Sequence, residues 1–137
     1  MVLLGCESPH VEYRMVGCAS LPSPRAAATS FVVGDYAYVF GGRDSAGTYL
    51  NDLWQYDTQN DTWTSLGKTP LKERVNATAC VHDGVAYIGL GFNGRYSNST
   101  GYLQDWWKYD PHTNTWQPLS DYPAHTTARA VCMVGDG

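Results

Sequence analysis

Side chains suited to binding a polar ligand gather in a few segments of this chain. They are Arg25, Arg43, Asp44, Arg74, Asn93, Arg95, Tyr96 and Tyr102. A guanidinium group forms forked hydrogen bonds with a carboxylate, and a tyrosine ring stacks on the flat face of a ligand. The chemistry that these residue types favour is therefore recognition of carboxylates and sugar hydroxyls.

Motifs for catalysis or metal binding are absent from the sequence. The four histidines have no spacing typical of metal ligands; they are His10, His82, His112 and His125. The chain also contains no nucleophile elbow, phosphate-binding loop or zinc signature. We therefore expect no catalytic residue, no metal site and no cofactor.

The segments that must position the candidate residues repeat along the chain. Residues 49–70 read YLNDLWQYDTQNDTWTSLGKTP, and residues 102–123 read YLQDWWKYDPHTNTWQPLSDYP, with 10 of 22 positions identical. Upstream, residues 25–42 match residues 74–91 at 7 of 18 positions. A period near 50 residues indicates a repeat architecture in which each unit packs against its neighbour.

Each unit contains four short runs that predict β-strands. In the first unit these runs cover residues 30–33, 36–40, 52–56 and 62–66. They are rich in Val, Tyr, Trp and Thr and are separated by Gly, Asp and Asn, which is the pattern of strands joined by turns. Since no segment shows a sustained helical period, we expect almost no helix.

Several spaced motifs resemble the kelch signature. Gly41 and Gly42 close the second strand, Tyr56 and Asp57 end the third, and Trp63 follows Tyr56 by seven residues. The matching positions of the second unit are Gly91, Tyr109, Asp110 and Trp116, with Leu90 in place of the first glycine.

The resemblance to the kelch-repeat β-propeller family implies an all-β fold made of four-stranded antiparallel blades. Aromatic residues and glycines at the repeated positions are then expected to be structural. This set comprises Gly41, Gly42, Trp54, Tyr56, Trp63, Gly91, Trp107, Tyr109 and Trp116.

The same alignment divides the chain into two complete repeats and a partial one at each end. Residues 25–73 and 74–125 are the two complete blades. We expect residues 11–24 to hold the outer strand of a preceding blade and residues 126–137 to begin a third. Because propellers typically close with four or more blades, we expect these blades to be part of a larger propeller.

Residues 1–10 are interpreted as a tether or the remnant of a signal sequence. The run MVLLGC resembles the end of a bacterial lipoprotein signal, in which Cys6 would be lipidated. The later wording YIGLGFNG and DWWKYDPHTNTW is similar to kelch proteins of Bacteroidetes-type bacteria. These resemblances imply a periplasmic or cell-surface lipoprotein, with accidental similarity as the alternative because the usual charged start is missing.

Two of the four cysteines hold equivalent positions in successive units. Cys80 and Cys132 both align with Phe31, and no CxxC pair is present. The simplest interpretation is a small buried side chain at each position. We expect no disulfide between Cys80 and Cys132, because equivalent sites on adjacent blades are usually too far apart.

Charge and hydropathy exclude two classes of partner. The formal net charge is −4 and no basic cluster is present, which argues against nucleic acid. No apolar run approaches the roughly 20 residues that a membrane-spanning helix requires.

In a kelch propeller, the loops at residues 43–51 and 92–104 would open on one face. Arg25 and Arg74 would begin inner strands near that face, either as ligand contacts or as ion pairs with acidic neighbours such as Asp44. Binding is favoured for Arg43, Arg95 and Tyr96, because nothing in the repeat requires them.

We interpret the chain as a non-catalytic binding module that recognises a glycan or a protein through this loop face. The alternative is a propeller enzyme acting on sugars, because kelch propellers include sialic-acid mutarotases and copper-dependent galactose oxidases. The oxidase is the weaker alternative, since its set of Tyr and His copper ligands with a modified Cys-Tyr pair is not visible in these two units.

Overall fold

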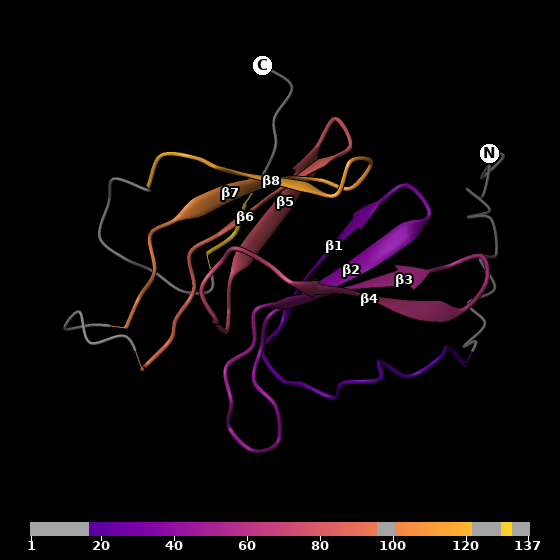
Figure 1. The fold of residues 1–137 in the computed structure, drawn as a ribbon, viewed down its shortest axis with the longest axis horizontal. Coiled ribbons are helices and arrows are strands. Elements are labelled where there is room, and N and C mark those ends of the chain that lie inside the picture. The colour runs from indigo at the N-terminus through magenta and orange to yellow at the C-terminus, as the bar shows by residue number, and fades with distance from the viewer. Residues whose placement is uncertain (1–16, 96–100, 122–129, 133–137) are drawn as a thin grey trace, which may run out of the picture.

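The described part of this computed structural model comprises residues 17–95, 101–121 and 130–132, and it contains eight β-strands and no helix. The strands are β1 (Thr29–Val33), β2 (Tyr36–Phe40), β3 (Asp52–Asp57), β4 (Thr62–Lys68), β5 (Thr78–His82), β6 (Val85–Gly89), β7 (Trp106–Asp110) and β8 (Thr115–Pro118). They form two four-stranded sheets in chain order, and every neighbouring pair is antiparallel. The predicted all-β fold with two four-stranded units is confirmed (Figure 1).

The predicted strands of the first unit agree with β1 to β4 except at their ends. β1 begins one residue earlier than expected, and β4 continues to Lys68 past a register shift opposite Leu53 and Trp54. Of residues 11–24, expected to hold an outer strand, only 17–24 are described, and none of these is in a strand. Of residues 126–137, expected to begin a third blade, 130–132 are described, and none of these is in a strand.

Cross-strand pairing decides which side chains meet the neighbouring sheet. Phe31 pairs with Tyr38, and Tyr38 pairs with Gln55, so these three share one face of the first sheet. The Phe31 and Tyr38 rings stack 4.9 Å apart. Both rings meet the edge of Tyr109 from the second sheet, at 6.4 and 6.1 Å.

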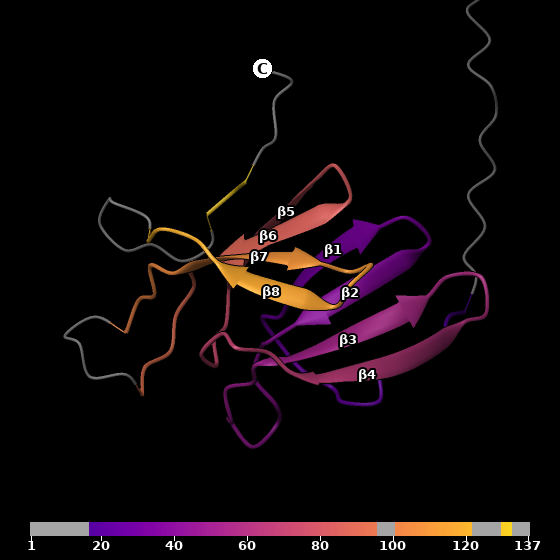
Figure 2. The same ribbon diagram turned by 45° about the horizontal axis from the view of Figure 1, so that its top comes forward.

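The apolar core therefore lies between the two sheets. Figure 2 shows the second sheet lying across one face of the first. Buried side chains from both sheets form one cluster, and the inter-sheet contacts run from β1 to β5 and β6. The cluster comprises Phe31, Val33, Tyr38, Phe40, Leu53, Leu71, Ala86, Ile88 and Tyr109, with Trp107 and Trp116 packed against it.

The glycines that end β2 permit a close approach of backbone segments. Gly42 has φ of 97°, and a Cβ at this position would lie 2.9 Å from the Ala26 carbonyl oxygen. Gly91 holds the same role in the second unit, where a Cβ would lie 2.7 Å from the Val75 carbonyl oxygen. Leu90, which replaces the first glycine of the pair, adopts φ of 57° and is buried. The repeat thus keeps its backbone shape even where the glycine is lost.

Cys80 and Cys132 form a disulfide, so the expectation that they would not pair is wrong. Their Cα atoms are 5.5 Å apart, a usual separation for a disulfide. The expectation assumed that both cysteines hold the position of Phe31, which would place them one sheet apart.

Two equivalent hydrogen bonds show which residues of the first interface correspond to the segment that contains Cys132. The Thr29 hydroxyl donates to the Ala77 carbonyl oxygen at 2.7 Å, and the Thr78 hydroxyl donates to the Ala130 carbonyl oxygen at 2.8 Å. Thr29 and Thr78 are equivalent in the repeat, so Ala130 occupies the place of Ala77.

Cys132 therefore lies where Ala79 lies in the preceding interface. The sequence alignment had instead made Cys132 equivalent to Cys80, which is one residue away from the position of Ala79. Because successive residues of an extended chain point to opposite faces, this offset directs Cys132 toward the second sheet and Cys80.

No helix within the described residues is long and apolar enough to cross a membrane.

Candidate binding site at the loop edge

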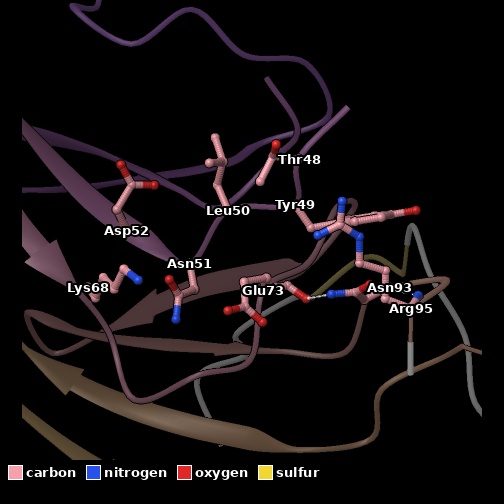
Figure 3. A pocket seen from close by; sticks show the side chains of 9 residues that line it. All are labelled: Thr48, Tyr49, Leu50, Asn51, Asp52, Lys68, Glu73, Asn93 and Arg95. Carbon is pink, nitrogen blue, oxygen red and sulfur yellow. Dashed lines mark hydrogen bonds between the residues drawn. The ribbon is translucent and has the colours of Figure 1, made fainter. Parts of the chain in front are cut away.

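A cleft of about 430 Å³ opens where the two units meet, at the edge of the sheets that carries the β2–β3, β4–β5 and β6–β7 connections. We call this the loop edge. Figure 3 shows the side chains that line the cleft: Thr48, Tyr49, Leu50, Asn51, Asp52, Lys68, Glu73, Asn93 and Arg95. The first unit supplies most of them, and the second supplies Asn93 and Arg95.

Arg95 and Tyr49 face one another across the boundary between the units (Figure 3). The guanidinium carbon of Arg95 lies 6.0 Å from the centre of the Tyr49 ring. This is the distance of a cation–π contact at its outer limit. The Arg95 side chain is exposed and makes no ion pair within the described residues. It therefore retains its hydrogen-bond donors for a ligand.

Asn93 positions Arg95, and its own amide group is already hydrogen-bonded within the protein. Its amide nitrogen donates to the Glu73 carbonyl oxygen at 2.7 Å, and its amide oxygen accepts from the Arg95 backbone N–H at 3.0 Å. Asn93 is almost completely buried. The side chain thus fastens the β6–β7 connection to the β4–β5 connection.

Asp44 does not line the cleft but holds the turn that leads into Thr48 and Tyr49, which do. Its carboxylate accepts from the Thr48 backbone N–H at 2.8 Å, and its own N–H donates to the Thr48 carbonyl oxygen at 3.1 Å. Next along the chain, Tyr49 is held by a backbone bridge to Arg43. The turn therefore fixes the direction in which Tyr49 leaves the backbone.

Two further polar side chains line the cleft, and one of them, Asn51, is already hydrogen-bonded within the protein. Asn51 donates to the carbonyl oxygens of Thr69 and Leu71, at 3.4 and 3.0 Å. Lys68, at the end of β4, makes no ion pair within the described residues. Together with Arg95, it places two cationic groups around the opening.

Arg25 forms a buried ion pair, as the structural alternative proposed, but its partner is Asp52 and not Asp44. Its terminal nitrogens donate to the two Asp52 carboxylate oxygens at 2.6 and 2.9 Å. The same guanidinium donates to the Gly41 carbonyl oxygen, and the Trp54 indole N–H donates to Asp52 at 2.7 Å. The Arg25 side chain is 1% exposed.

Arg74 repeats this arrangement in the second unit. It donates to both Asp105 oxygens at 2.7 Å and to the Leu90 carbonyl oxygen at 3.0 Å. The Trp107 indole N–H donates to Asp105 at 3.0 Å. In both units the guanidinium donors are used inside the protein, so the geometry supports a structural role for Arg25 and Arg74.

The two paired carboxylates are held in the charged form. Burial alone would raise the pKa of Asp105, but the hydrogen bonds and charge of Arg74 and the hydrogen bond from Trp107 outweigh burial and lower it. The pKa of Asp52 is lowered in the same way by Arg25 and Trp54, against burial. Asp52 therefore contributes a carboxylate to the cleft wall whose charge is already balanced by Arg25.

A second cleft of about 360 Å³ occupies the corresponding place on the second unit. Tyr102 and Asp105 line it where Tyr49 and Asp52 line the first. Asp121 takes the place of Lys68, so the sign of the charge at this position is reversed. The two clefts thus hold equivalent places in the repeat and differ in the charge at this position.

The residues predicted to bind a ligand do not all line the same cleft. Asn93 and Arg95 line the first cleft, and Tyr102 lines the second, where its ring meets Phe92 at 5.3 Å. Arg43 is exposed but lines neither cleft. Tyr96 and Cys6 lie outside the described residues.

Sequence reasoning missed seven of the nine lining residues of the first cleft, among them Tyr49, Lys68 and Glu73. Tyr49 could have been found, because it aligns with Tyr102 in the repeat. Lys68 and Glu73 carried no comparable signal, since Lys68 at the end of β4 aligns with Asp121 and Glu73 lies in the connection that follows β4. Within the described residues, no group of three His, Cys, Asp or Glu side chains is arranged to hold a metal ion.

The repeated structural residues lie where blades meet or where strands end. Trp107, Tyr109 and Trp116 pack in or against the core between the sheets. Tyr56 and Trp63 pair on the outer hairpin of the first sheet, where the Trp63 indole donates to the Ala19 carbonyl oxygen at 2.8 Å.

Comparison with known proteins agrees with this geometry. A family model described as the KLHDC2/KLHL20/DRC7 Kelch-repeats domain matches residues 7–136. Kelch domain-containing protein 3 of Rattus norvegicus is 30% identical over 118 residues, which cover 77% of this chain and 30% of that protein. N-acetylneuraminate epimerase of Shigella flexneri is 35% identical over 121 residues, covering 85% of this chain and 31% of the enzyme.

A solved structure has the same architecture. The structure of YjhT superimposes with a TM-score of 0.70 at 24% identity, over 81% of this chain and 42% of that chain. This chain spans less than one third of the length of Kelch domain-containing protein 3 and of the epimerase. The family match and the common fold show that this chain belongs to the kelch-repeat family and that its two sheets are blades of a kelch-type β-propeller.

Proposed function

We propose that the chain is a kelch-propeller binding module whose loop edge binds a small carbohydrate that carries a carboxylate. The observation that carries this proposal is the cleft between the blades, in which Arg95 of one blade lies over Tyr49 of the other. A ligand in this cleft would contact both blades at once.

The size and the lining of the cleft suit a sugar acid. Its volume of about 430 Å³ is in the range of small-molecule sites. Arg95 offers a planar donor pair for a carboxylate, and Tyr49 offers a ring face for the apolar side of a sugar. Lys68 adds a second cation at the opening, and the Asp52 charge is balanced by Arg25. The two cations Arg95 and Lys68 therefore outnumber the remaining Glu73 carboxylate in the lining. An acidic ligand is therefore favoured over a neutral or cationic one.

A binding titration with a matched control tests the proposal. N-acetylneuraminate is the probe, because the name of a relative with 35% identity identifies this sugar acid. We expect saturable binding by calorimetry, and Arg95→Ala should weaken it while leaving the melting temperature unchanged. The control is His112→Ala in the β7–β8 turn, away from the loop edge, which should not affect binding. If the chain bound no sugar acid but bound a protein, and Arg95→Ala weakened that binding, the ligand of the cleft would be a peptide and not a sugar.

The second candidate is catalysis of sugar-ring opening in the same cleft. It is favoured by the similarity to N-acetylneuraminate epimerase and by the presence of the Glu73 carboxylate and the Lys68 ammonium group in the lining. Such a reaction needs one group to remove a proton and one to donate it. Anomer exchange of N-acetylneuraminate followed by NMR separates the two functions, because a binding module leaves the exchange rate as it is in buffer.

A further inference from the structure

We propose that Cys80 and Cys132 are an oxidative modification site, whose disulfide latches residues 130–132 onto the second blade in an oxidising compartment. This inference is independent of the ligand proposed above. It rests on the position of the two cysteines within the repeat.

Cys80 lies on the face of the second blade that is equivalent to the packed face of the first. Cys80 pairs with Tyr87, and Tyr87 pairs with Lys108, so these side chains share a face. In the first blade the equivalent face carries Phe31 and Tyr38, and it packs against the second blade. The face of Cys80 is therefore the one that receives the next part of the chain.

The disulfide takes the place of the aromatic contacts that join the first blade to the second. In the first interface, Phe31 stacks on Tyr38 and meets Tyr109 across the boundary. Cys80 stands at the position of Phe31 and has no ring to make such contacts. Its covalent link to Cys132 holds the next segment instead.

Only one other side-chain bond fastens this segment within the described residues. The Thr78 hydroxyl donates to the Ala130 carbonyl oxygen at 2.8 Å. Val131 is 85% exposed and contributes little packing. The docking of residues 130–132 therefore depends on the state of the two sulfur atoms.

The latch closes by thiol–disulfide exchange with a disulfide oxidant, such as oxidised glutathione or an oxidoreductase. One cysteine thiolate attacks the disulfide of the oxidant, which forms a mixed disulfide and displaces one sulfur of the oxidant as a thiolate. The second cysteine thiolate then attacks the protein sulfur of that mixed disulfide and displaces the other sulfur of the oxidant. Two electrons pass to the oxidant, and the two protons of the cysteine thiols end on the two thiols of the reduced oxidant. Such bonds persist in oxidising compartments and are rare in the cytosol, so the latch predicts secretion or export.

Peptide mapping tests whether the bond forms. The full chain is incubated with oxidised and reduced glutathione, unreacted thiols are alkylated, and the protein is cleaved with trypsin without reduction. Cleavage after Arg74, Arg95 and Arg129 isolates Cys80 in residues 75–95 and Cys132 in residues 130–137. We expect these two peptides as one linked species that separates on reduction. Both peptides fully alkylated, or either linked to Cys6 or Cys18, would overturn the proposal.

NMR relaxation tests whether the bond acts as a latch. Reduction of the wild-type chain should lower the backbone order parameters of residues 130–132 from about 0.85, typical of rigid backbone, to below about 0.6, because release of the link frees the segment. Cys132→Ala should have the same effect without reductant. Cys18→Ser is the control, since Cys18 is exposed and outside any disulfide in the described chain. Unchanged order parameters in reduced wild-type protein would contradict the latch even if the linked peptide is found.

Discussion

The Arg74 guanidinium is completely buried and donates to both carboxylate oxygens of Asp105 at 2.7 Å. The same group also reaches the Leu90 carbonyl oxygen at the end of β6. Arg74, at the start of the second blade, is therefore bonded to both ends of the β6–β7 connection at the loop edge. Arg25 and Asp52 repeat the relationship in the first blade.

Asp105→Asn should destabilise the fold by about 2–3 kcal/mol, because it leaves a buried guanidinium without its counter-charge. This is less than the ~3–5 kcal/mol typical of a fully buried pair, since the Asp105 side chain is 31% exposed. The free energy of unfolding in urea measures the change. Asp121→Asn, an exposed carboxylate at the same edge, is the control and should stay within about 0.5 kcal/mol of wild type. Equal effects of the two variants would show that the pair adds nothing.

Stability should fall in acid because of the two paired carboxylates. The pKa values of Asp52 and Asp105 are lowered in the folded state, so their contribution is present above the unfolded pKa of about 3.9. It is lost as the pH falls through the lower folded pKa. We expect the melting temperature to drop between about pH 5 and pH 2, and Asp105→Asn to flatten that dependence. An unchanged slope in the variant would remove Asp105 as a cause.

Gly42→Ala should destabilise the first blade by roughly 1–3 kcal/mol, because φ is positive and the new Cβ would approach the Ala26 carbonyl oxygen. Gly34→Ala is the matched control. Gly34 also has positive φ, but a Cβ there would meet nothing within 4 Å. The difference in unfolding free energy between the variants isolates the backbone contact, and a smaller loss for Gly42→Ala would argue against it.

The sequence alone was sufficient for the fold because the repeat marks strands and turns at the same time. The glycines, Tyr56 and Trp63 have spacings that few other architectures share. The ends of the strands were less certain, since β4 continues to Lys68 across an irregular pairing that no local pattern announces.

The candidate site was predicted only in part. Asn93 and Arg95 were predicted as polar residues of the loop at 92–104, whereas Lys68 and Glu73 enter the cleft from the β4 end and the following turn. Arg25 and Arg74 looked equally suited to a ligand and to an ion pair, and only the three-dimensional position of Asp52 and Asp105 distinguishes these roles. The disulfide was missed because a one-residue offset of the segment at Cys132 is invisible to an alignment of repeats.

Calorimetry should compare the binding of N-acetylneuraminate to wild type, Arg95→Ala and His112→Ala. We expect saturable binding by the wild type and His112→Ala, with affinity at least about tenfold weaker in Arg95→Ala because a charged, forked contact is lost. Binding of equal strength in Arg95→Ala, with its melting temperature unchanged, would contradict the claim that the cleft at the loop edge is the site.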